Sequence, residues 1–304
     1  MKDVSDKINT LRVASACASI TAAPETIKLV KEGMVPKGNV IETAKAAGIL
    51  AAKKTSELVP FCHPVPLDHV SLEFELMAEE IIITSTVKAI WKTGVEMEAL
   101  TSVTIAALTA YDMLKPLDNN LEIKSVRLLE KKGGKSDFKE EFKVPLKAAI
   151  LVISDSTYQG KRKDKSGQII LEKLKLQPVE IVKYEILPDD LEKIKTRLLE
   201  LCDKDKVDIV LTTGGTGLGP KDLTVEATQS ALEREVPGLV ETARMYGQNR
   251  TPYSMLSRGI AGTRGKSLII NLPGSSNGAK ESMDCLFPAV LHAFKMIWGG
   301  GHKE

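Results

Sequence analysis

A proline-rich stretch, PFCHPVPLDH (60–69), contains Cys62, His63 and His69, side chains that can bind zinc or transfer protons. A zinc site would need a fourth ligand. Adjacent residues of an extended segment point to opposite sides, so Cys62 and His63 are poor partners for one ion. The prolines favour a stiff loop. We therefore expect no metal here, but a loop that presents His63 to a ligand, with Cys62 as a lesser contact.

A glycine-rich turn, TTGGTG (212–217), follows an apolar strand pattern and precedes a predicted helix. Closely spaced glycines let backbone N–H groups approach a phosphate, and a helix N-terminus adds positive potential. The turn has neither the GxxxxGK[ST] nor the GxGxxG pattern. Lys221 and Asp222 follow it, and these types hold phosphate and hydrated Mg²⁺ respectively. The alternative is a tight turn in which Asp222 or Thr224 only caps the helix.

Polar residues also follow three other predicted strands of this half. They are Ser154-Asp155-Ser156, Pro188-Asp189-Asp190 and the turn 271–276. If the strands are parallel, their carboxyl ends meet at the edge where α/β sheets bind ligands. A lone aspartate at a strand end, such as Asp189, is more often only a helix cap. Several polar strand ends around one glycine-rich turn favour a binding cleft.

A long helix is predicted over residues 95–115, with two polar clusters in an otherwise apolar sequence. Glu96 and Glu98 lie near its N-terminus, where carboxylates favour the helix dipole. Asp112 and Lys115 are three residues apart and share a face. From the residues alone, the simplest interpretation is a first-turn acid and a surface ion pair worth roughly 0.2–0.5 kcal/mol.

The elements around these residues divide the chain into two dissimilar halves. The charged, glycine-containing stretch 131–141 is typical of a linker, and we predict domains at 1–143 and 144–304. In the first half the helical patterns are separate from the strand patterns, which predicts an α+β fold. The helices are expected at 24–33, 41–58 and 95–115, and the strands at 70–76, 81–91 and 121–131.

In the second half, strands and helices alternate, which predicts an α/β, doubly wound, mostly parallel sheet. Strands are expected at 148–153, 179–186, 207–213 and 267–272. Helices are expected at 166–175, 189–202, 224–235, 238–247 and 277–297.

The composition limits the location and the partners. A net charge of +2 gives no support for nucleic acid or membrane as a partner. The four cysteines form no CxxC pair, so a disulfide framework is not expected and a reducing cytoplasm fits. No signal-peptide pattern and no apolar run of about 18 residues is present, so we expect a cytoplasmic protein.

The motifs ISDS, LPDD, TTGGTGLGPKDLTVEAT and LSRGIAGTRGKSLIINLPGS resemble the MogA/MoaB molybdopterin-binding family over nearly all of 146–297. The resemblance implies an α/β, typically trimeric fold that uses ATP and Mg²⁺ to adenylate the terminal phosphate of molybdopterin. It implies Asp189 and Asp222 as catalytic residues. It also implies five residues that bind the ligand: Gly214, Gly215, Thr216, Gly217 and Ser275.

One departure from that pattern concerns Lys221, which stands where many members have arginine; it keeps the charge but loses the bidentate fork. Some members lack activity. The alternative for this half is therefore a scaffold that binds molybdopterin and drives trimerisation without catalysis.

The segments KGNVIETAKAAGILAAKKTSELVPFCHPVPLDHV, TGVEMEALTSVTIAALTAYDMLK and KSVRLLEKKGGKS resemble MoaC, the cyclic pyranopterin monophosphate synthase family, from residue 3 to 138. The resemblance implies a ferredoxin-like α+β fold and a hexamer of dimers with sites at subunit interfaces. The implied reaction converts cyclised dihydro-GTP to cyclic pyranopterin monophosphate and releases pyrophosphate.

The same resemblance assigns residues. Asp112 would be an acid/base, with Lys115 beside it and Lys37 as a further functional lysine. The residues that match the substrate-binding segments are Phe61, Cys62, His63, Met97 and Glu98. Neither KGNV for the usual KGDV nor Phe61 for a common leucine removes a catalytic group.

Further expectations concern charge and assembly. Because Lys53 and Lys54 lie on the preceding helix, we expect neighbouring lysines to lower the pKa of Lys115. Together, the two halves predict a bifunctional, homo-oligomeric enzyme, trimer or hexamer, of molybdenum cofactor biosynthesis.

Overall fold

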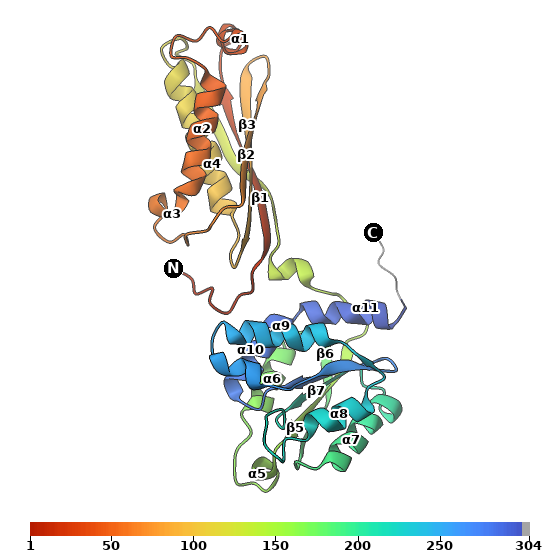
Figure 1. Ribbon diagram of the computed structural model, residues 1–304. Coiled ribbons are helices and arrows are strands. Elements are labelled where there is room, and N and C mark those ends of the chain that lie inside the picture. Colours follow the sequence, from red (N-terminus) through yellow and green to blue (C-terminus); the bar gives the residue numbers. More distant parts are fainter. Residues whose placement is uncertain (300–304) are drawn as a thin grey trace. The chain divides into compact units, whose positions relative to one another are not determined.

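The chain folds into two compact units, Met1–Asp137 and Phe138–Glu304, in a computed structural model that describes residues 1–299 (Figure 1). Each unit has its own sheet and hydrophobic core. The domain boundary expected between residues 143 and 144 stays a prediction. Within residues 1–299, no helix is long and apolar enough to cross a membrane.

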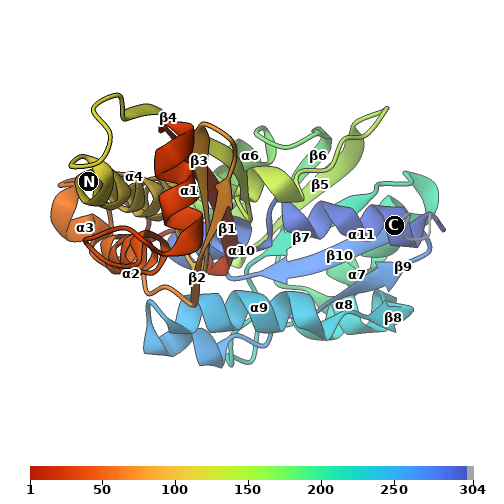
Figure 2. The same cartoon turned by 90° about the horizontal axis from the view of Figure 1, so that it is seen from above.

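The first unit is a four-stranded antiparallel sheet with α2 and α4 packed on one face (Figures 1 and 2). The strand order is β2-β3-β1-β4. In chain order the elements are β1 (Thr10–Thr21), α1 (Pro24–Glu32), α2 (Val40–Lys53), α3 (Thr55–Leu58), β2 (His69–Leu76), β3 (Glu80–Trp91), α4 (Glu96–Leu114) and β4 (Glu122–Lys132).

Small side chains let α4 approach the sheet. Ala14, Ala16 and Ala18 of β1 are fully buried in the core that α4 covers. The sequence did not predict β1. Its residues, TLRVASACASIT, alternate alanine with serine and lack the large apolar side chains that mark a half-buried strand.

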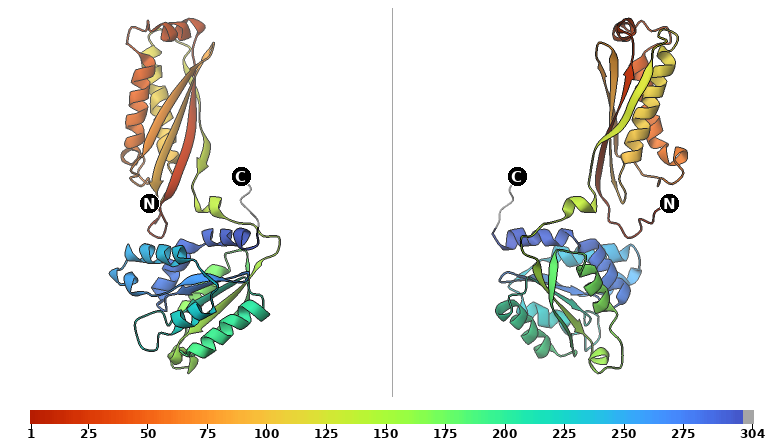
Figure 3. Two further views of the ribbon diagram at one scale, coloured as in Figure 1. Left: turned by 45° about the vertical axis from the view of Figure 1, so that its right-hand side comes forward. Right: turned by 180° about the vertical axis from the view of Figure 1, so that it is seen from behind.

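The second unit is a six-stranded mixed sheet in the order β6-β5-β7-β10-β9-β8. Figure 3 shows this unit in two further views. Its strands are β5 (Leu146–Ile153), β6 (Val179–Leu187), β7 (Ile209–Thr213), β8 (Arg234–Glu235), β9 (Ala261–Arg264) and β10 (Ser267–Leu272). Its helices are α5 (Asp155–Tyr158), α6 (Ser166–Leu174), α7 (Leu191–Leu199), α8 (Thr224–Ala231), α9 (Pro237–Gln248), α10 (Ser276–Leu286) and α11 (Ala293–Ile297). The four predicted strands pair in parallel, and β9 and β8 extend them antiparallel.

Helices cover both faces of this sheet, so its central strands are nearly continuous apolar runs. Ile194 and Leu198 of α7 and Ala227 of α8 pack on one face, whereas α9 and α10 lie on the other (Figure 1). From β5 the chain continues to β6 on one side and later to β7 on the other. The carboxyl ends of β5 and β7 therefore form a switch point, where α/β proteins bind ligands.

Two helices of this unit end earlier than predicted. The helix expected over 224–235 stops at Ala231, because Arg234 and Glu235 pair with β9. The helix expected over 277–297 is interrupted at Pro288, which lacks a backbone N–H, and divides into α10 and α11. Short 3₁₀ turns lie at Lys135–Phe138, Pro252–Leu256 and Ala289–His292, and a π turn, Glu200–Lys204, extends α7.

Candidate functional sites

Asp112, near the end of α4, forms ion pairs with two lysines. Its Oδ1 lies 2.7 Å from Nζ of Lys115, and its Oδ2 lies 3.0 Å from Nζ of Lys37. Lys37 also donates a hydrogen bond of 2.8 Å to the main-chain oxygen of Asp112. Gly38, with φ +101°, turns the chain just before α2 and leaves Lys37 beside the end of α4. The structure thus brings together the three residues predicted as catalytic in this half.

These contacts set the charges of the cluster. Hydrogen bonds from Lys115 and Lys37 hold the pKa of Asp112 below its usual range. The hydrogen bond with Asp112 raises the pKa of Lys115. The expected lowering of the pKa of Lys115 is therefore wrong, because its nearest charge is a carboxylate rather than another lysine. Near neutral pH the pair consists of a carboxylate and an ammonium.

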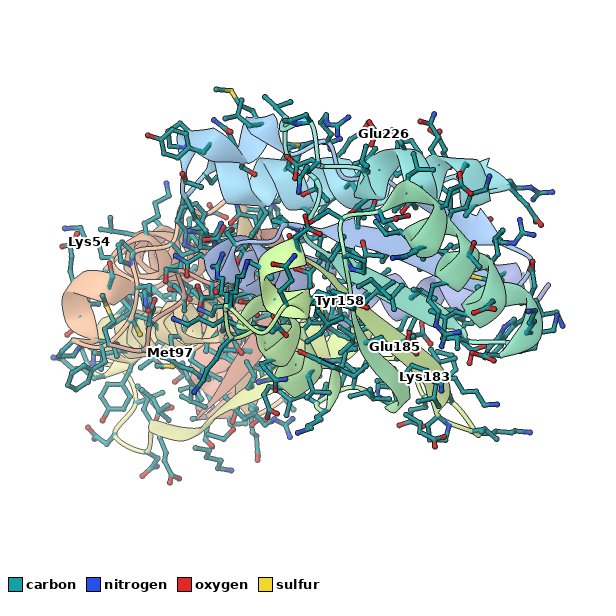
Figure 4. The ribbon with its side chains drawn as sticks, turned by 90° about the horizontal axis from the view of Figure 1, so that it is seen from below. Lys54, Met97, Tyr158, Lys183, Glu185 and Glu226 are labelled. Atoms are coloured by element: carbon teal, nitrogen blue, oxygen red, sulfur yellow. The ribbon has the colours of Figure 1, made fainter. Side chains whose placement is uncertain are left out.

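A second group of predicted residues lies at the start of α4. Glu98 is 4% exposed, and burial followed by the charge of Glu96 raises its pKa. Cys62 is near enough for Glu98 to add to the rise in thiol pKa that burial causes. Phe61, beside Cys62 and His63, is 79% exposed, and Met97, in the first turn of α4 and labelled in Figure 4, is 40% exposed. This end of the unit offers a buried carboxyl group and two exposed apolar side chains.

The two groups are far apart within one chain. Glu98 and Asp112 lie on the same helix, α4, fourteen residues apart. At 1.5 Å per residue their separation along the axis is about 21 Å. A ligand of nucleotide size therefore cannot contact both carboxyl groups of one chain.

The sequence did not predict a polar cavity of about 230 Å³ that lies near the start of α4. Four cations line it, Lys7, Arg12, Lys131 and Lys132, together with two acidic residues, Glu96 and Asp137. Arg12 is 7% exposed, donates to the carbonyls of Trp91 and Lys92, and has a pKa lowered by burial. The charged stretch at the end of β4 contributes residues to this cavity. Because its composition is equally typical of a linker, it did not predict a binding site.

The cleft of the second unit lies at the predicted sheet edge. A cavity of about 430 Å³ is lined by five of the predicted residues: Asp189, Gly214, Gly215, Asp222 and Ser275. Ser154 and Thr213 line it from the ends of β5 and β7. Thr216 and Gly217 do not line the cavity. Thr216 is buried, and the carbonyl of Gly217 is bonded to Arg258.

Two glycines of the turn are required by its geometry. Gly214 and Gly215 have φ +102° and +62°, values that residues other than glycine rarely adopt. A Cβ on Gly214 would lie 2.2 Å from the carbonyl oxygen of Ile153, and one on Gly215 would lie 2.2 Å from Oγ1 of Thr224. The turn therefore packs against β5 and the first residue of α8.

Arg258, a residue that the sequence did not single out, makes two hydrogen bonds to this turn and two to the residues that follow it. Its Nε and Nη2 donate to the carbonyls of Gly217 and Asp222, each at 2.7 Å. Its Nη1 donates to Oε1 of Glu226 on α8 at 2.6 Å, and its backbone N–H donates to the carbonyl of Thr216 at 2.9 Å. These bonds hold the glycine turn to α8.

The acidic residues of the cleft are connected to each other. The amide of Asp155 donates to Oδ2 of Asp189 at 2.8 Å, and the amide of Asp189 donates back to Oδ1 of Asp155 at 3.1 Å. Lys221 lies 2.7 Å from Oδ2 of Asp155. Burial, followed by the charges of Asp155 and Asp222, raises the pKa of Asp189, and Lys221 opposes them.

The two carboxyl groups that line this cleft suit a magnesium ion bound together with a phosphate. Within residues 1–299 no three His, Cys, Asp or Glu side chains converge as a metal site. Mg²⁺ commonly binds one or two carboxylates plus substrate phosphates and water. Asp189 and Asp222, which line one polar cavity, meet that requirement.

Comparisons with known proteins cover both units. The MoaC family model matches residues 1–134, and the model of a probable molybdopterin binding domain matches residues 149–292. A molybdenum cofactor biosynthesis bifunctional protein of Chlorobaculum tepidum is 42% identical over 302 residues, 99% of this chain and 96% of that protein. A cyclic pyranopterin monophosphate synthase of Aquifex aeolicus is 55% identical over 136 residues, 45% of this chain and 54% of that protein. Among solved structures, the molybdopterin biosynthesis enzyme MoaB of Thermus thermophilus is 45% identical, covering 51% of this chain and 97% of that chain with a TM-score of 0.49.

Proposed function

The chain belongs to the family of bifunctional molybdenum cofactor biosynthesis proteins, and on this premise we propose a separate reaction for each unit. The first unit converts cyclised dihydro-GTP to cyclic pyranopterin monophosphate and releases pyrophosphate. The second unit adenylates molybdopterin with ATP and Mg²⁺.

The contact of Asp112 with Lys115 and Lys37 is the observation that supports the first reaction. Opening and rebuilding a ring requires several proton transfers, and a carboxylate paired with an ammonium supplies a base and an acid. Asp112 accepts protons, Lys115 donates them, and Lys37 stabilises the negative charge that develops. Four cations, Arg12 and three lysines, outnumber the two carboxylates that line the cavity near the start of α4, so that cavity suits the triphosphate.

We further propose that this site forms between copies of the chain in a homo-oligomer, a trimer or a hexamer. The separation of about 21 Å between Glu98 and Asp112 supports this, since a second copy is needed to bring both to one substrate. The βαββαβ framework and the strand order β2-β3-β1-β4 support a ferredoxin-like classification of the unit. All four cysteines are free, which supports a reducing, cytoplasmic location.

In the second unit, the glycine turn and the two carboxyl groups in one cavity support adenylyl transfer. An oxygen of the terminal phosphate of molybdopterin attacks the α-phosphorus of ATP and forms a new P–O bond. The bond to the bridging oxygen breaks, and pyrophosphate leaves with its electron pair. Asp189 and Asp222 would hold Mg²⁺, which offsets the repulsion between the two anions. The backbone N–H groups near Gly214 and Gly215 hold a phosphate.

The experiment is to supply the purified chain with each substrate in turn and follow pyrophosphate and pterin product. Cyclised dihydro-GTP should give cyclic pyranopterin monophosphate. Molybdopterin with Mg²⁺ and ATP should give adenylated molybdopterin. Molybdopterin binding in calorimetry without pyrophosphate release would instead assign a scaffold role to the second unit.

A further inference from the structure

The basic loop 161–165 belongs to the cleft of the second unit, but the reaction above assigns it no role. Arg162, Lys163 and Lys165 line the same cavity as Asp189 and Asp222. Each of the three residues is exposed. Across residues 1–299, their side chains have no hydrogen bond or ion pair. Three unpaired cations therefore face a cavity that also contains the phosphate-binding turn.

The backbone of the loop is fixed, so these cations are presented at a defined place. At its start, the N–H groups of Lys161 and Arg162 donate to the carbonyl of Ser156 at 2.9 and 3.2 Å. At its end, Asp164 accepts a 2.9 Å hydrogen bond from the N–H of Gly167 and another from the hydroxyl of Tyr184. Asp164 is thus engaged by the start of α6 and by β6, and it does not neutralise the neighbouring cations.

The negative charge on each part of the two substrates decides which phosphate group these cations bind. A phosphate monoester carries at most two negative charges, whereas the pyrophosphate end of ATP carries more and exposes more oxygens. In adenylyl transfer the bridging oxygen gains an electron pair, so the negative charge on this end increases as the bond breaks. Cations held there stabilise the transition state more than the ground state.

We propose that Arg162, Lys163 and Lys165 form a polyphosphate subsite that holds the β- and γ-phosphates of the nucleotide and then the departing pyrophosphate. This assignment rests on the proposed adenylyl transfer. It is specific to the anion and does not depend on the pterin.

The test uses calorimetric titration of the full chain with α,β-methylene-ATP, AMP and phenyl phosphate, each with Mg²⁺. The variant is the triple substitution Arg162→Met, Lys163→Met and Lys165→Met. A matched control, Lys183→Met, Lys195→Met and Lys266→Met, removes the same charge from residues of this unit that do not line the cavity. Lys183 lies on β6 (Figure 4).

If the subsite exists, the triple variant should lose affinity only for the ligand that carries β- and γ-phosphates. The triple variant should bind α,β-methylene-ATP at least about tenfold more weakly than the wild type. Its affinities for AMP and phenyl phosphate, and all affinities of the control, should change less than about twofold. An unchanged thermal midpoint would show that the fold is intact.

Two results would overturn the subsite while leaving adenylyl transfer in place. One is an equal loss for α,β-methylene-ATP and AMP, and the other is a loss confined to phenyl phosphate, which would assign the cations to the pterin phosphate. If the wild-type chain bound no nucleotide, both the subsite and the proposed reaction would fail.

Discussion

Glu98 is a carboxyl group that the fold buries at the start of α4. Burial raises its pKa, and the charge of Glu96 raises it further. Between the ordinary pKa of a glutamate and this raised value, the unfolded chain binds fewer protons than the folded one. Stability therefore falls as pH rises through that window. A residue that lowers stability near neutral pH, at a predicted binding site, fits a functional role.

We therefore expect Glu98→Gln to raise the thermal midpoint of the first unit at pH 8. The gain should shrink as pH falls and disappear below the ordinary glutamate pKa, where both forms are neutral. Calorimetric scans of wild type and variant between pH 4 and pH 8 measure this, with Glu57→Gln on the exposed surface as a control. A variant that is less stable than the wild type at pH 8 would contradict the account.

Arg258 gives a prediction for the second unit. Arg258→Lys keeps the charge but loses the planar fork that reaches Gly217, Asp222 and Glu226 at once. We expect affinity for α,β-methylene-ATP to fall about tenfold, because the turn loses charge-assisted hydrogen bonds. Arg264→Lys, which disturbs a pair with Asp203 outside the cavity, is the control. Equal affinities of Arg258→Lys and wild type would show that the turn holds its shape without the guanidinium.

Some contacts of these residues could be predicted from the sequence, and others could not. Asp112 and Lys115 could be paired from their spacing, because positions three apart share a helix face. Lys37 is 75 residues from Asp112, and only the family resemblance pointed to it. Arg258 contacts the glycine turn only because the chain folds back after α9, and no local pattern encodes that contact.

At the scale of elements, the crossing of α2 and α4 depends on Gly48. A Cβ there would lie 3.0 Å from the carbonyl oxygen of Ser102 and 3.2 Å from Cβ of Ala106. The helices would have to separate, and they are the elements that carry Asp112 and place Lys37 beside it.

We expect Gly48→Ala to destabilise the first unit by about 1–2 kcal/mol, because overpacking outweighs the gain in helix propensity. Gly238→Ala on α9 is a matched control, since no atom lies within 4 Å of the added Cβ, and it should be neutral or stabilising. Urea denaturation measures both variants. Gly48→Ala with wild-type stability would mean that the helices adjust without cost.

Elements with strong periodicity were predictable, and the others required tertiary contacts. The alternation in β2 and the apolar runs of β5 and β7 are visible in the sequence. The short strand β9 forms because it pairs with β10, and β8 forms because it pairs with β9. The four residues AGTR of β9 have no strand pattern of their own.

At the scale of the whole molecule, the distance between Glu98 and Asp112 predicts complementation between copies. Glu98→Ala and Asp112→Ala chains should each be nearly inactive as synthases. Mixed in equal amounts after mild dissociation, they should regain about a quarter of wild-type activity, because random pairing leaves that share of the sites with both residues. No recovery in mixtures that exchange subunits would place both residues in one chain's site.

We propose that one chain carries two independent catalytic sites, one in each unit. This is tested by assays of both reactions on the chain that carries Asp112→Ala and on the chain that carries Asp222→Ala. We expect Asp112→Ala to lose synthase activity at least about a hundredfold while adenylyl transfer is retained, and Asp222→Ala to show the reverse. Full synthase activity in Asp112→Ala, or the loss of both activities in either variant with its fold intact, would contradict the account.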